Sequence, residues 1–282
     1  MSTEKLIYNG KLMNANAAFI SPNNRSFRYG DGFFETMKMV NGKILLCNEH
    51  LERLFTSLEL LAFEKPIHFT APYLQNEIES LAKKNYHNKL ARIRLTVFRG
   101  EGGLYDVANN FPNYIIQTWE LNPANNTFNE NGLVIDIFKD ARKAYDAFSA
   151  IKSNNYLCYT MAALWAKKNK LNDALLLNSF DRVADATIAN VFIVQDGIIK
   201  TPAITEAGVN GITKRYLIKC MKNEAMPVQE TQITVDEILQ AQEVFFTNSI
   251  YGIKWVKQCS SSNYITQLAP LLHKKFVAPL VL

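Results

Sequence analysis

The sequence predicts two mixed α+β domains in tandem, and three features of the residue pattern predict this fold class. Asn9–Gly10 and Asn41–Gly42 each separate two apolar runs, which is typical of a tight β-hairpin because both turn residues tolerate a positive φ. After Asn48 the leucines recur three and four positions apart, which predicts an amphipathic helix. Residues 122–132 (NPANNTFNENG) are polar and rich in turn formers, so we predict an interdomain linker there.

The two predicted domains cover residues 1–121 and 133–282. In the first, apolar and polar residues alternate over 91–98 and again over 114–121, which predicts two half-buried strands. In the second, a long segment over 156–169 is rich in helix-forming residues and predicts a helix. Strands and helices are therefore mixed in both halves, as in α+β domains.

The composition is that of an ordinary globular protein. Hydrophobic residues make up 48% of the 282 residues and charged residues 20%, which excludes a disordered chain. The net charge of +5 is small and scattered, so we expect no nucleic-acid partner. The four cysteines lack CxxC spacing, and we expect no metal site. The N-terminus lacks the apolar core of a signal peptide and no apolar run has the length of a membrane span, so we expect a cytoplasmic protein without a membrane partner.

One segment indicates a phosphate-binding site from its residues alone. A glycine-containing turn at Gly208–Gly211 leads directly into a predicted helix at Thr213, and the free N–H groups of a helix N-terminus attract phosphate. An ordinary helix cap is the simpler interpretation of these residues when they are taken alone. The sequence contains no dinucleotide-binding glycine motif and no P-loop.

Five sequence blocks become informative when they are read together. They are FRYGDGFFET at Phe27–Thr36, HLERL at His50–Leu54, IKSNNYL at Ile151–Leu157, VADATIANVF at Val183–Phe192, and GITKR at Gly211–Arg215 with TNS at Thr247–Ser249. In this order and spacing they resemble the class IV aminotransferase family, also called the fold type IV pyridoxal-phosphate enzymes. The resemblance covers nearly the whole chain.

The resemblance implies a fold, a cofactor and an assembly. The fold would have a smaller N-terminal antiparallel sheet with helices and a larger C-terminal pseudo-barrel with helices. The cofactor would be pyridoxal 5'-phosphate (PLP), the substrate a small amino compound, and the assembly a homodimer whose active sites lie between the two domains.

The resemblance also assigns the residues that hold the cofactor. Lys152 matches the lysine that binds the cofactor aldehyde, which requires a primary amine, and that later moves protons at the substrate α-carbon. Arg53 matches the arginine that binds the phosphate, whose planar donors suit a dianion. Asp185 stands where the family usually has a glutamate that pairs with the pyridine nitrogen, and Asn190 matches the asparagine of the same block.

Further residues complete the predicted site. The backbone N–H groups of Ile212 and Thr213 and the hydroxyl groups of Thr213 and Ser249 would bind the phosphate. For the substrate, the resemblance implies that Tyr29 and Glu35 line or support the pocket and that Arg99 binds a carboxylate. A solvated arginine at a strand end is the alternative interpretation of Arg99.

Two reaction classes share this family pattern. RGEGGLY at Arg99–Tyr105 and TNSIYGI at Thr247–Ile253 are similar to aminodeoxychorismate lyases, which eliminate pyruvate to give 4-aminobenzoate. The alternative is an aminotransferase acting on D-amino or branched-chain amino acids; the spacing from Lys152 to Asn155 resembles the D-amino-acid enzymes more than the branched-chain ones. A third interpretation is a binding protein that keeps the fold and has lost catalysis.

Overall fold

The structure of the chain is a computed structural model that describes residues 4–17, 20–106 and 109–281. It divides into two compact units, the first comprising Met1–Pro123 with Lys152–Asn155 and the second Ala124–Ile151 with Tyr156–Leu282. The first division falls inside 122–132, where the sequence predicts a linker; the exact domain limits stay a prediction. Within the described ranges, no helix combines the length and the apolar character that a membrane span requires.

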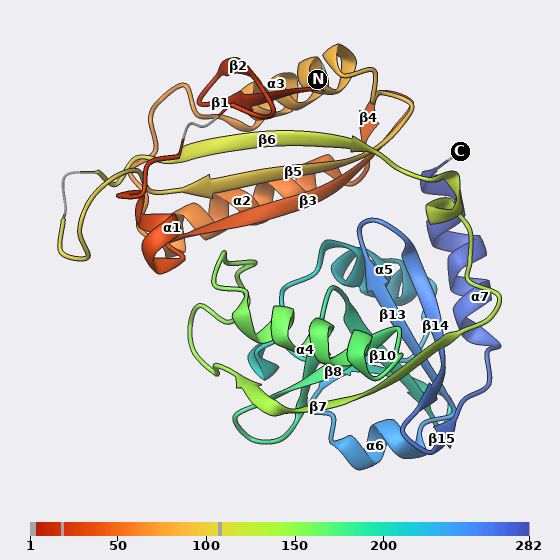
Figure 1. Cartoon of the computed structure of the whole chain (residues 1–282). Helices are drawn as coiled ribbons and strands as arrows, with labels where there is room; N and C mark the ends of the chain where they lie inside the picture. The colour runs from red at the N-terminus through yellow and green to blue at the C-terminus, as the bar shows by residue number, and fades with distance from the viewer. Residues whose placement is uncertain (1–3, 18–19, 107–108, 282) are drawn as a thin grey trace. The chain divides into compact units, whose positions relative to one another are not determined.

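In its described residues, the first unit is an antiparallel sheet with three helices (Figure 1). Its elements are β1 (Lys5–Tyr8), β2 (Lys11–Asn14), α1 (Arg25–Tyr29), β3 (Gly32–Val40), β4 (Lys43–Ile44), α2 (Cys47–Leu60), α3 (Ala71–Lys84), β5 (Leu90–Phe98) and β6 (Asn113–Glu120). The six strands follow the order β2-β1-β6-β5-β3-β4, and every neighbouring pair is antiparallel. This confirms the predicted N-terminal sheet.

Both Asn-Gly pairs form the predicted hairpin turns. Asn9 and Gly10 have φ values of 48° and 77°, and Asn41 and Gly42 have 49° and 78°, so each pair supplies two positive φ angles. The helix α1 was not predicted, because the sequence favoured only strands and turns before Asn48. It forms because the side chain of Asn24 accepts hydrogen bonds from the first backbone N–H groups of the helix.

The two faces of this sheet differ in chemistry. On β5 the alternate residues Ile93, Leu95 and Val97 are fully buried and form the apolar face, which α2 and α3 cover through contacts with β1, β3 and β6. The opposite face is here called the Phe34 face. It is defined by Phe34, Thr36 and Lys38 of β3, Arg92, Arg94 and Thr96 of β5, and Trp119 of β6.

The second unit is a mixed sheet of nine strands with helices around it. Its strands are β7 (Leu133–Lys143), β8 (Asp173–Asn178), β9 (Val183–Ala186), β10 (Asn190–Gln195), β11 (Ile198–Pro202), β12 (Val228–Thr231), β13 (Glu243–Asn248), β14 (Gly252–Cys259) and β15 (Ser262–Asn263). Its helices are α4 (Leu157–Lys168), α5 (Ile212–Asn223), α6 (Val235–Gln240) and α7 (Leu268–Leu272). Shorter turns of helix cover Pro123–Asn126, Ile204–Glu206, His273–Val277 and Ala278–Leu280.

The nine-stranded sheet curls into a partial barrel. Its order is β12-β11-β10-β13-β14-β7-β8-β9, with β15 beside β14. The end strand β9 also contacts β10 and β11, so the sheet bends back towards itself. This confirms the predicted C-terminal pseudo-barrel.

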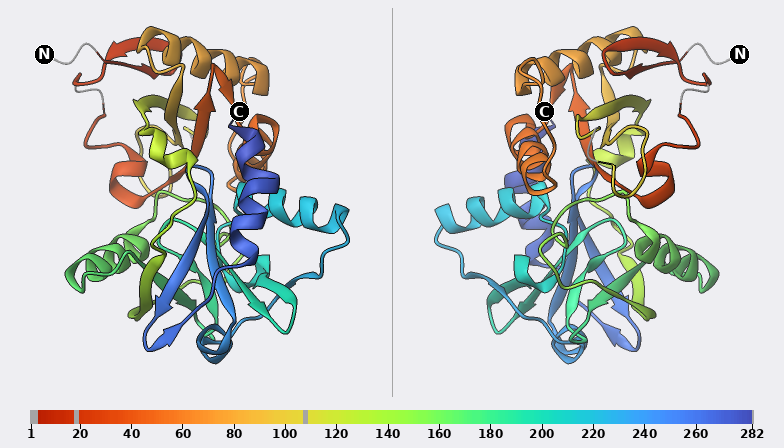
Figure 2. Two further views of the ribbon diagram at one scale, coloured as in Figure 1. Left: turned by 90° about the vertical axis from the view of Figure 1, so that its right-hand side faces the viewer. Right: turned by 90° about the vertical axis from the view of Figure 1, so that its left-hand side faces the viewer.

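Side chains alternate between the inside and the outside of this barrel. Val191, Leu175 and Phe246 join one apolar cluster inside it. On the outside, Phe192 packs with α5 and α7, while Leu176 packs with α4. Figure 2 shows α5 and α7 on one side of this sheet and α4 on another. Because helices cover the outer face of these strands, both of their faces are buried, and their sequences are continuous apolar runs.

Candidate functional site

The segment that carries Lys152 is held against β3 by backbone hydrogen bonds. The N–H of Phe34 donates to the carbonyl of Lys152, and the N–H of Asn154 donates to the carbonyl of Gly32, each at 2.9 Å. Gly32 permits this close approach, because a Cβ atom there would lie 2.6 Å from Asn154 Nδ2 and 2.5 Å from the carbonyl oxygen of Val97. Gly32, the second glycine of the Gly30–Asp31–Gly32 segment, therefore has a packing role in placing Lys152.

The amine of Lys152 and the guanidinium of Arg94 lie over the same aromatic ring. Lys152 Nζ is 4.7 Å from the centroid of Phe34, and the central guanidinium carbon of Arg94 is 3.7 Å from it. Arg94 Nε also donates to Thr96 Oγ1 at 3.1 Å. Sequence reasoning missed Arg94, although the alternation of Arg92, Arg94 and Thr96 along a half-buried strand is a signal for it.

Arg53, the predicted phosphate ligand, is bound by the buried carboxylate of Glu35. Arg53 Nε donates to Glu35 Oε1 at 2.7 Å, and Nη2 donates to Oε2 at 2.6 Å. His50 Nδ1 lies 2.7 Å from Oε2. Burial acts to raise the pKa of Glu35, but Arg53 and His50 outweigh it and lower the pKa to about 2. Glu35 is thus an ionised acceptor that orients Arg53, and its contact with substrate stays a prediction.

This pairing predicts a stability that depends on pH. The pKa of Glu35 is lowered from 4.5 to about 2, so folding gains stability that is present above pH 4.5 and is lost as the pH falls towards 2. We expect Glu35→Gln to lower the free energy of unfolding at neutral pH by on the order of 3 kcal/mol. The deficit should shrink in denaturant titrations at progressively lower pH. Glu59→Gln, on the exposed side of α2, is the control, and a deficit that does not change with pH would contradict the assignment.

The guanidinium of Arg99 donates hydrogen bonds to several groups within the first unit. Nη1 donates to Asp31 Oδ1 at 2.7 Å, Nη2 donates to the carbonyls of Leu61 and Ala62, and Nε donates to Asn110. The residue is only 8% exposed, so it is not the solvated arginine of the alternative interpretation. These contacts favour a structural role, and binding of a substrate carboxylate by Arg99 stays a prediction.

Tyr29 lies at the C-terminal end of α1, and its side chain is exposed. The guanidinium of Arg28 lies 5.2 Å from the centre of its ring, and Gly30 ends the helix in the left-handed conformation. The structure therefore gives Tyr29 access to solvent, while its predicted place in the substrate pocket stays a prediction.

In the second unit, Asp185 is buried on β9 and is held by one of its two oxygens. The hydroxyl of Tyr159 donates to Oδ2 at 2.8 Å, and the N–H of Val209 donates to the same oxygen at 2.9 Å. Lys143 Nζ lies 3.6 Å from it. Oδ1 is buried and has no hydrogen-bond partner among the described residues, which is rare for a carboxylate oxygen.

Val209 connects Asp185 to the start of α5. Its carbonyl accepts a hydrogen bond of 2.8 Å from Asn190 Nδ2, while its N–H binds Asp185. Asn190 in turn packs against Gly211, where a Cβ atom would lie 1.8 Å from Asn190 Oδ1. Only glycine fits at this position, and the predicted residues Asp185 and Asn190 are therefore linked through one loop.

The first turn of α5 carries the predicted phosphate ligands. Gly211 is the N-cap and supplies no side-chain hydrogen bond, so no N-cap side chain satisfies the first N–H groups of Ile212 and Thr213. Thr247 faces Asn190 across β10 and β13, and its buried hydroxyl has no partner among the described residues. Ser249 follows in the turn after β13, which the side chain of Asn248 stabilises.

These features of the second unit fit PLP. A buried carboxylate oxygen without a partner suits the protonated pyridine nitrogen, and a helix start without a capping side chain suits the phosphate dianion. The shorter side chain of Asp185, compared with the usual glutamate, still presents an oxygen without a partner. The residues that would hold the cofactor are thus present, although each assignment stays a prediction.

Comparison with known proteins agrees with the fold and with these features. Residues 32–259 match the family described as Amino-transferase class IV. The chain is 30% identical over 248 residues to a Methanocaldococcus jannaschii protein provisionally named branched-chain-amino-acid aminotransferase, covering 87% of this chain and 84% of the relative. It is 27% identical over 290 residues to aminodeoxychorismate lyase of Bacillus subtilis, covering 98% and 96%.

A solved structure shows the same fold. The branched-chain aminotransferase of the thermophilic archaeon Thermoproteus uzoniensis, solved with norvaline, superposes with a TM-score of 0.88 at 21% identity, covering 99% of this chain and 95% of that chain. The family match spans most of the sequence, and the chain therefore belongs to the class IV aminotransferase family. Members of this family are PLP-dependent enzymes, so the protein is an enzyme of this class.

Proposed function

We propose that the protein is a PLP-dependent lyase that eliminates pyruvate from aminodeoxychorismate and releases 4-aminobenzoate. The Phe34 face carries this proposal, because Lys152 and Arg94 share one aromatic ring on it. Lys38 and Arg92 lie on the same face, and Arg92 lies over the ring of Trp119. A face with aromatic rings and several cations suits an unsaturated six-membered ring with one carboxylate on the ring and a second on its enolpyruvyl substituent.

The residues of the chain have distinct tasks in this proposal. When bound, PLP would supply an electron sink for the electron pair left when the C–H bond at the amine-bearing carbon breaks; that pair then expels the enolpyruvyl group from the neighbouring carbon. The amine of Lys152 removes the proton at that carbon and later gives a proton to the departing enolpyruvyl group, which leaves as pyruvate, because the amine-bearing carbon of the aromatic product carries no hydrogen. Asp185 holds the ring nitrogen in its protonated form, Arg53 and the first turn of α5 bind the phosphate, and Arg94 binds a substrate carboxylate.

Turnover assays test the proposal directly. Purified protein with PLP is assayed for pyruvate release from aminodeoxychorismate, and in parallel for amino transfer to keto acids from D-alanine, L-glutamate and L-leucine. The lyase proposal predicts pyruvate release as the faster reaction. Turnover of the amino donors alone would contradict it.

Amino transfer is the second candidate. The 30% identity to the Methanocaldococcus jannaschii protein favours it, and this relative is named for branched-chain amino acids. A D-alanine aminotransferase of Listeria innocua is 28% identical over 254 residues, which favours a D-amino acid substrate instead. Both activities begin with removal of a proton by Lys152 and differ in their products, which the assay panel above distinguishes.

Arg94 and Arg99 provide a matched pair of substitutions. We expect Arg94→Met to raise KM by about 10- to 100-fold, because a charged hydrogen bond to a carboxylate is lost, and to leave stability nearly unchanged. Arg99→Met should instead lower the free energy of unfolding by about 2–4 kcal/mol, because the buried guanidinium and its charged hydrogen bonds to partly buried partners are lost. Steady-state kinetics and denaturant unfolding measure both effects. A larger rise in KM for Arg99→Met would assign the carboxylate to Arg99.

We further propose that the protein forms a homodimer through the outer face of α4. This helix is apolar on both sides: Tyr159, Ala162 and Ala166 are buried in the second unit, whereas Leu157, Met161 and Leu164 are exposed. A helix that is hydrophobic all round is normally buried on all sides. Ile188 is also exposed, beside this face.

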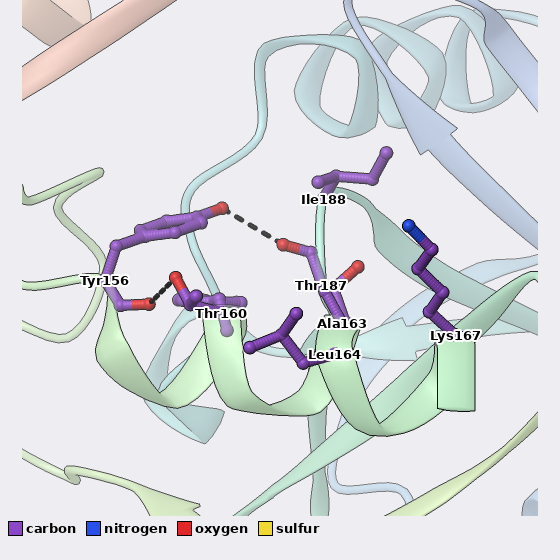
Figure 3. Close-up of a pocket in the computed structure, with 8 residues that line it drawn as sticks. Tyr156, Thr160, Ala163, Leu164, Lys167, Thr187 and Ile188 are labelled. Carbon is purple, nitrogen blue, oxygen red and sulfur yellow. Dashed lines mark hydrogen bonds between the residues drawn. The ribbon is translucent and has the colours of Figure 1, made fainter. Parts of the chain in front are cut away.

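A pocket beside α4 enlarges this apolar surface (Figure 3). Its volume is about 320 Å³, and Leu164 and Lys167 of α4 line it together with Ile188. The hydroxyl of Tyr156 donates to the carbonyl of Thr187 at 3.1 Å along its edge. An apolar hollow next to an exposed apolar helix face supports contact with a second copy of the chain.

We expect Leu164→Glu to shift the protein from dimer to monomer, because the substitution would bury an unpaired charge in the contact. Sedimentation velocity measures the sedimentation coefficient, which distinguishes a monomer from a dimer. Ile67→Glu makes the same change at a position that is 99% exposed and is the control. A monomeric wild-type protein would contradict the proposed dimer.

A further inference from the structure

A buried lysine and a buried tyrosine act together on one oxygen of Asp185. Lys143 ends β7, is 8% exposed, and places Nζ 3.6 Å from Asp185 Oδ2. It also donates to the hydroxyl of Tyr159 and lies 4.6 Å from the centre of that ring. The same hydroxyl donates to Asp185 Oδ2 at 2.8 Å. The three side chains form one hydrogen-bonded network.

An irregularity in β7 determines where Lys143 lies. Phe138 is paired with Leu176 of β8, but the next paired residue of β7 is Arg142, opposite Leu177. Such irregularities re-aim side chains and are frequent beside active sites. Here Lys143 turns to the buried network, while Arg142 Nε binds the exposed Asp181 at 2.7 Å.

The network leaves the two oxygens of Asp185 in different states. Oδ2 receives hydrogen bonds from Tyr159 and from the N–H of Val209, and it lies within ion-pair distance of Lys143. Oδ1 is buried and has no partner among the residues that the structure describes. The carboxylate is therefore fixed by one oxygen and presents the other.

We propose that Lys143 and Tyr159 are positioning residues that fix Asp185 through Oδ2 and so present Oδ1 to the ring nitrogen of PLP. This inference rests on the proposed function. The charge of Lys143 adds to the geometry, because an ammonium 3.6 Å from a buried carboxylate offsets part of the cost of burying the negative charge. Lys143 thereby supports an aspartate in a place where the family usually has the longer glutamate.

The protonation of the ring nitrogen provides a test that does not depend on turnover. Wild-type protein, Lys143→Met, Tyr159→Phe and Arg142→Met are reconstituted with PLP that carries ¹⁵N in its ring, and the ¹⁵N chemical shift is measured. We expect wild type and Arg142→Met to give the shift of a protonated nitrogen. Lys143→Met should move the shift towards that of an unprotonated nitrogen, and Tyr159→Phe should move it less in the same direction.

Cofactor affinity separates positioning from general structural damage. Each protein is titrated with PLP and with its 1-deaza analogue, in which a C–H replaces the ring nitrogen. We expect Lys143→Met to reduce the preference for PLP over the analogue by about 10-fold, because a charged hydrogen bond to the nitrogen is weakened. Arg142→Met should retain the wild-type preference.

The outcomes are distinguishable from failure of the proposed function. An unchanged ¹⁵N shift and preference in Lys143→Met would overturn the inference, and so would an equal loss of affinity for PLP and the analogue. If Lys143→Met does not fold, Tyr159→Phe decides by the same two measurements, because it keeps both the ammonium and the ring. Wild-type protein that binds no PLP would instead contradict the proposed function and this inference with it.

Discussion

Replacing Lys152 with alanine is expected to lower turnover by at least about 10³-fold, because the substitution removes both the amine that binds the cofactor aldehyde and the group that moves the proton. Borohydride reduction followed by peptide mapping is the second measurement. We expect a pyridoxyl group on the peptide with Lys152 in the wild-type protein and none at this position in the variant.

The backbone around residue 152 should persist in that variant. The hydrogen bonds that join the 152–155 segment to Phe34 and Gly32 are between main-chain atoms, so an alanine at position 152 retains them. Lys139→Ala, at an exposed position of β7, is the matched control and should keep activity and the modified peptide. A pyridoxyl group on a different lysine in wild type would contradict the assignment of Lys152.

The second large effect is expected at Asp185. Asp185→Asn keeps the size of the side chain but removes its negative charge, and we expect kcat/KM to fall by about 10²–10³-fold, because an electrostatic contact to the ring nitrogen is lost. The substitution should also lower the free energy of unfolding by about 1–3 kcal/mol, because Lys143 loses its buried counter-charge.

Asp181→Asn is the matched control for this prediction. Asp181 is an exposed carboxylate with a φ of 58°, a conformation that asparagine adopts readily, and it pairs with Arg142 at the surface. It should retain both kcat/KM and stability. Near-wild-type turnover in Asp185→Asn would show that the ring nitrogen does not depend on this carboxylate.

Much of the fold could be predicted from the sequence because its signals are local. The Asn-Gly pairs carry their own positive φ angles, and the helix predicted after Asn48 is α2. The strand predicted over 91–98 is β5, and the helix predicted over 156–169 is α4 within one residue at each end. In each case the turn chemistry or the period of apolar residues lies within one segment. The short helix α1 could not be predicted, because the capping residue Asn24 is the only local signal for it.

The site was predicted less completely, because side-chain partners depend on strand register. A motif predicts that Arg99 binds a substrate carboxylate, which stays a prediction, whereas the contacts of its guanidinium with Asp31 and with the carbonyls after α2 follow only from the tertiary structure. Arg94 lies on the Phe34 face only because β5 pairs with β3 in a register that sets Thr36 opposite Arg94. A shift of one residue would move every side chain of the strand to the other face.

The family, the mixture of strands and helices in both halves and the residues with the right chemistry could be inferred from the sequence alone, because motifs, turns and apolar periods lie in neighbouring positions. Which side chains come into contact depends instead on the three-dimensional packing. Glu35 binds Arg53 across β3 and α2, and Lys143 reaches Asp185 through an irregular strand pair. Such contacts join residues far apart in sequence, and their geometry follows from packing and register, which no local pattern specifies.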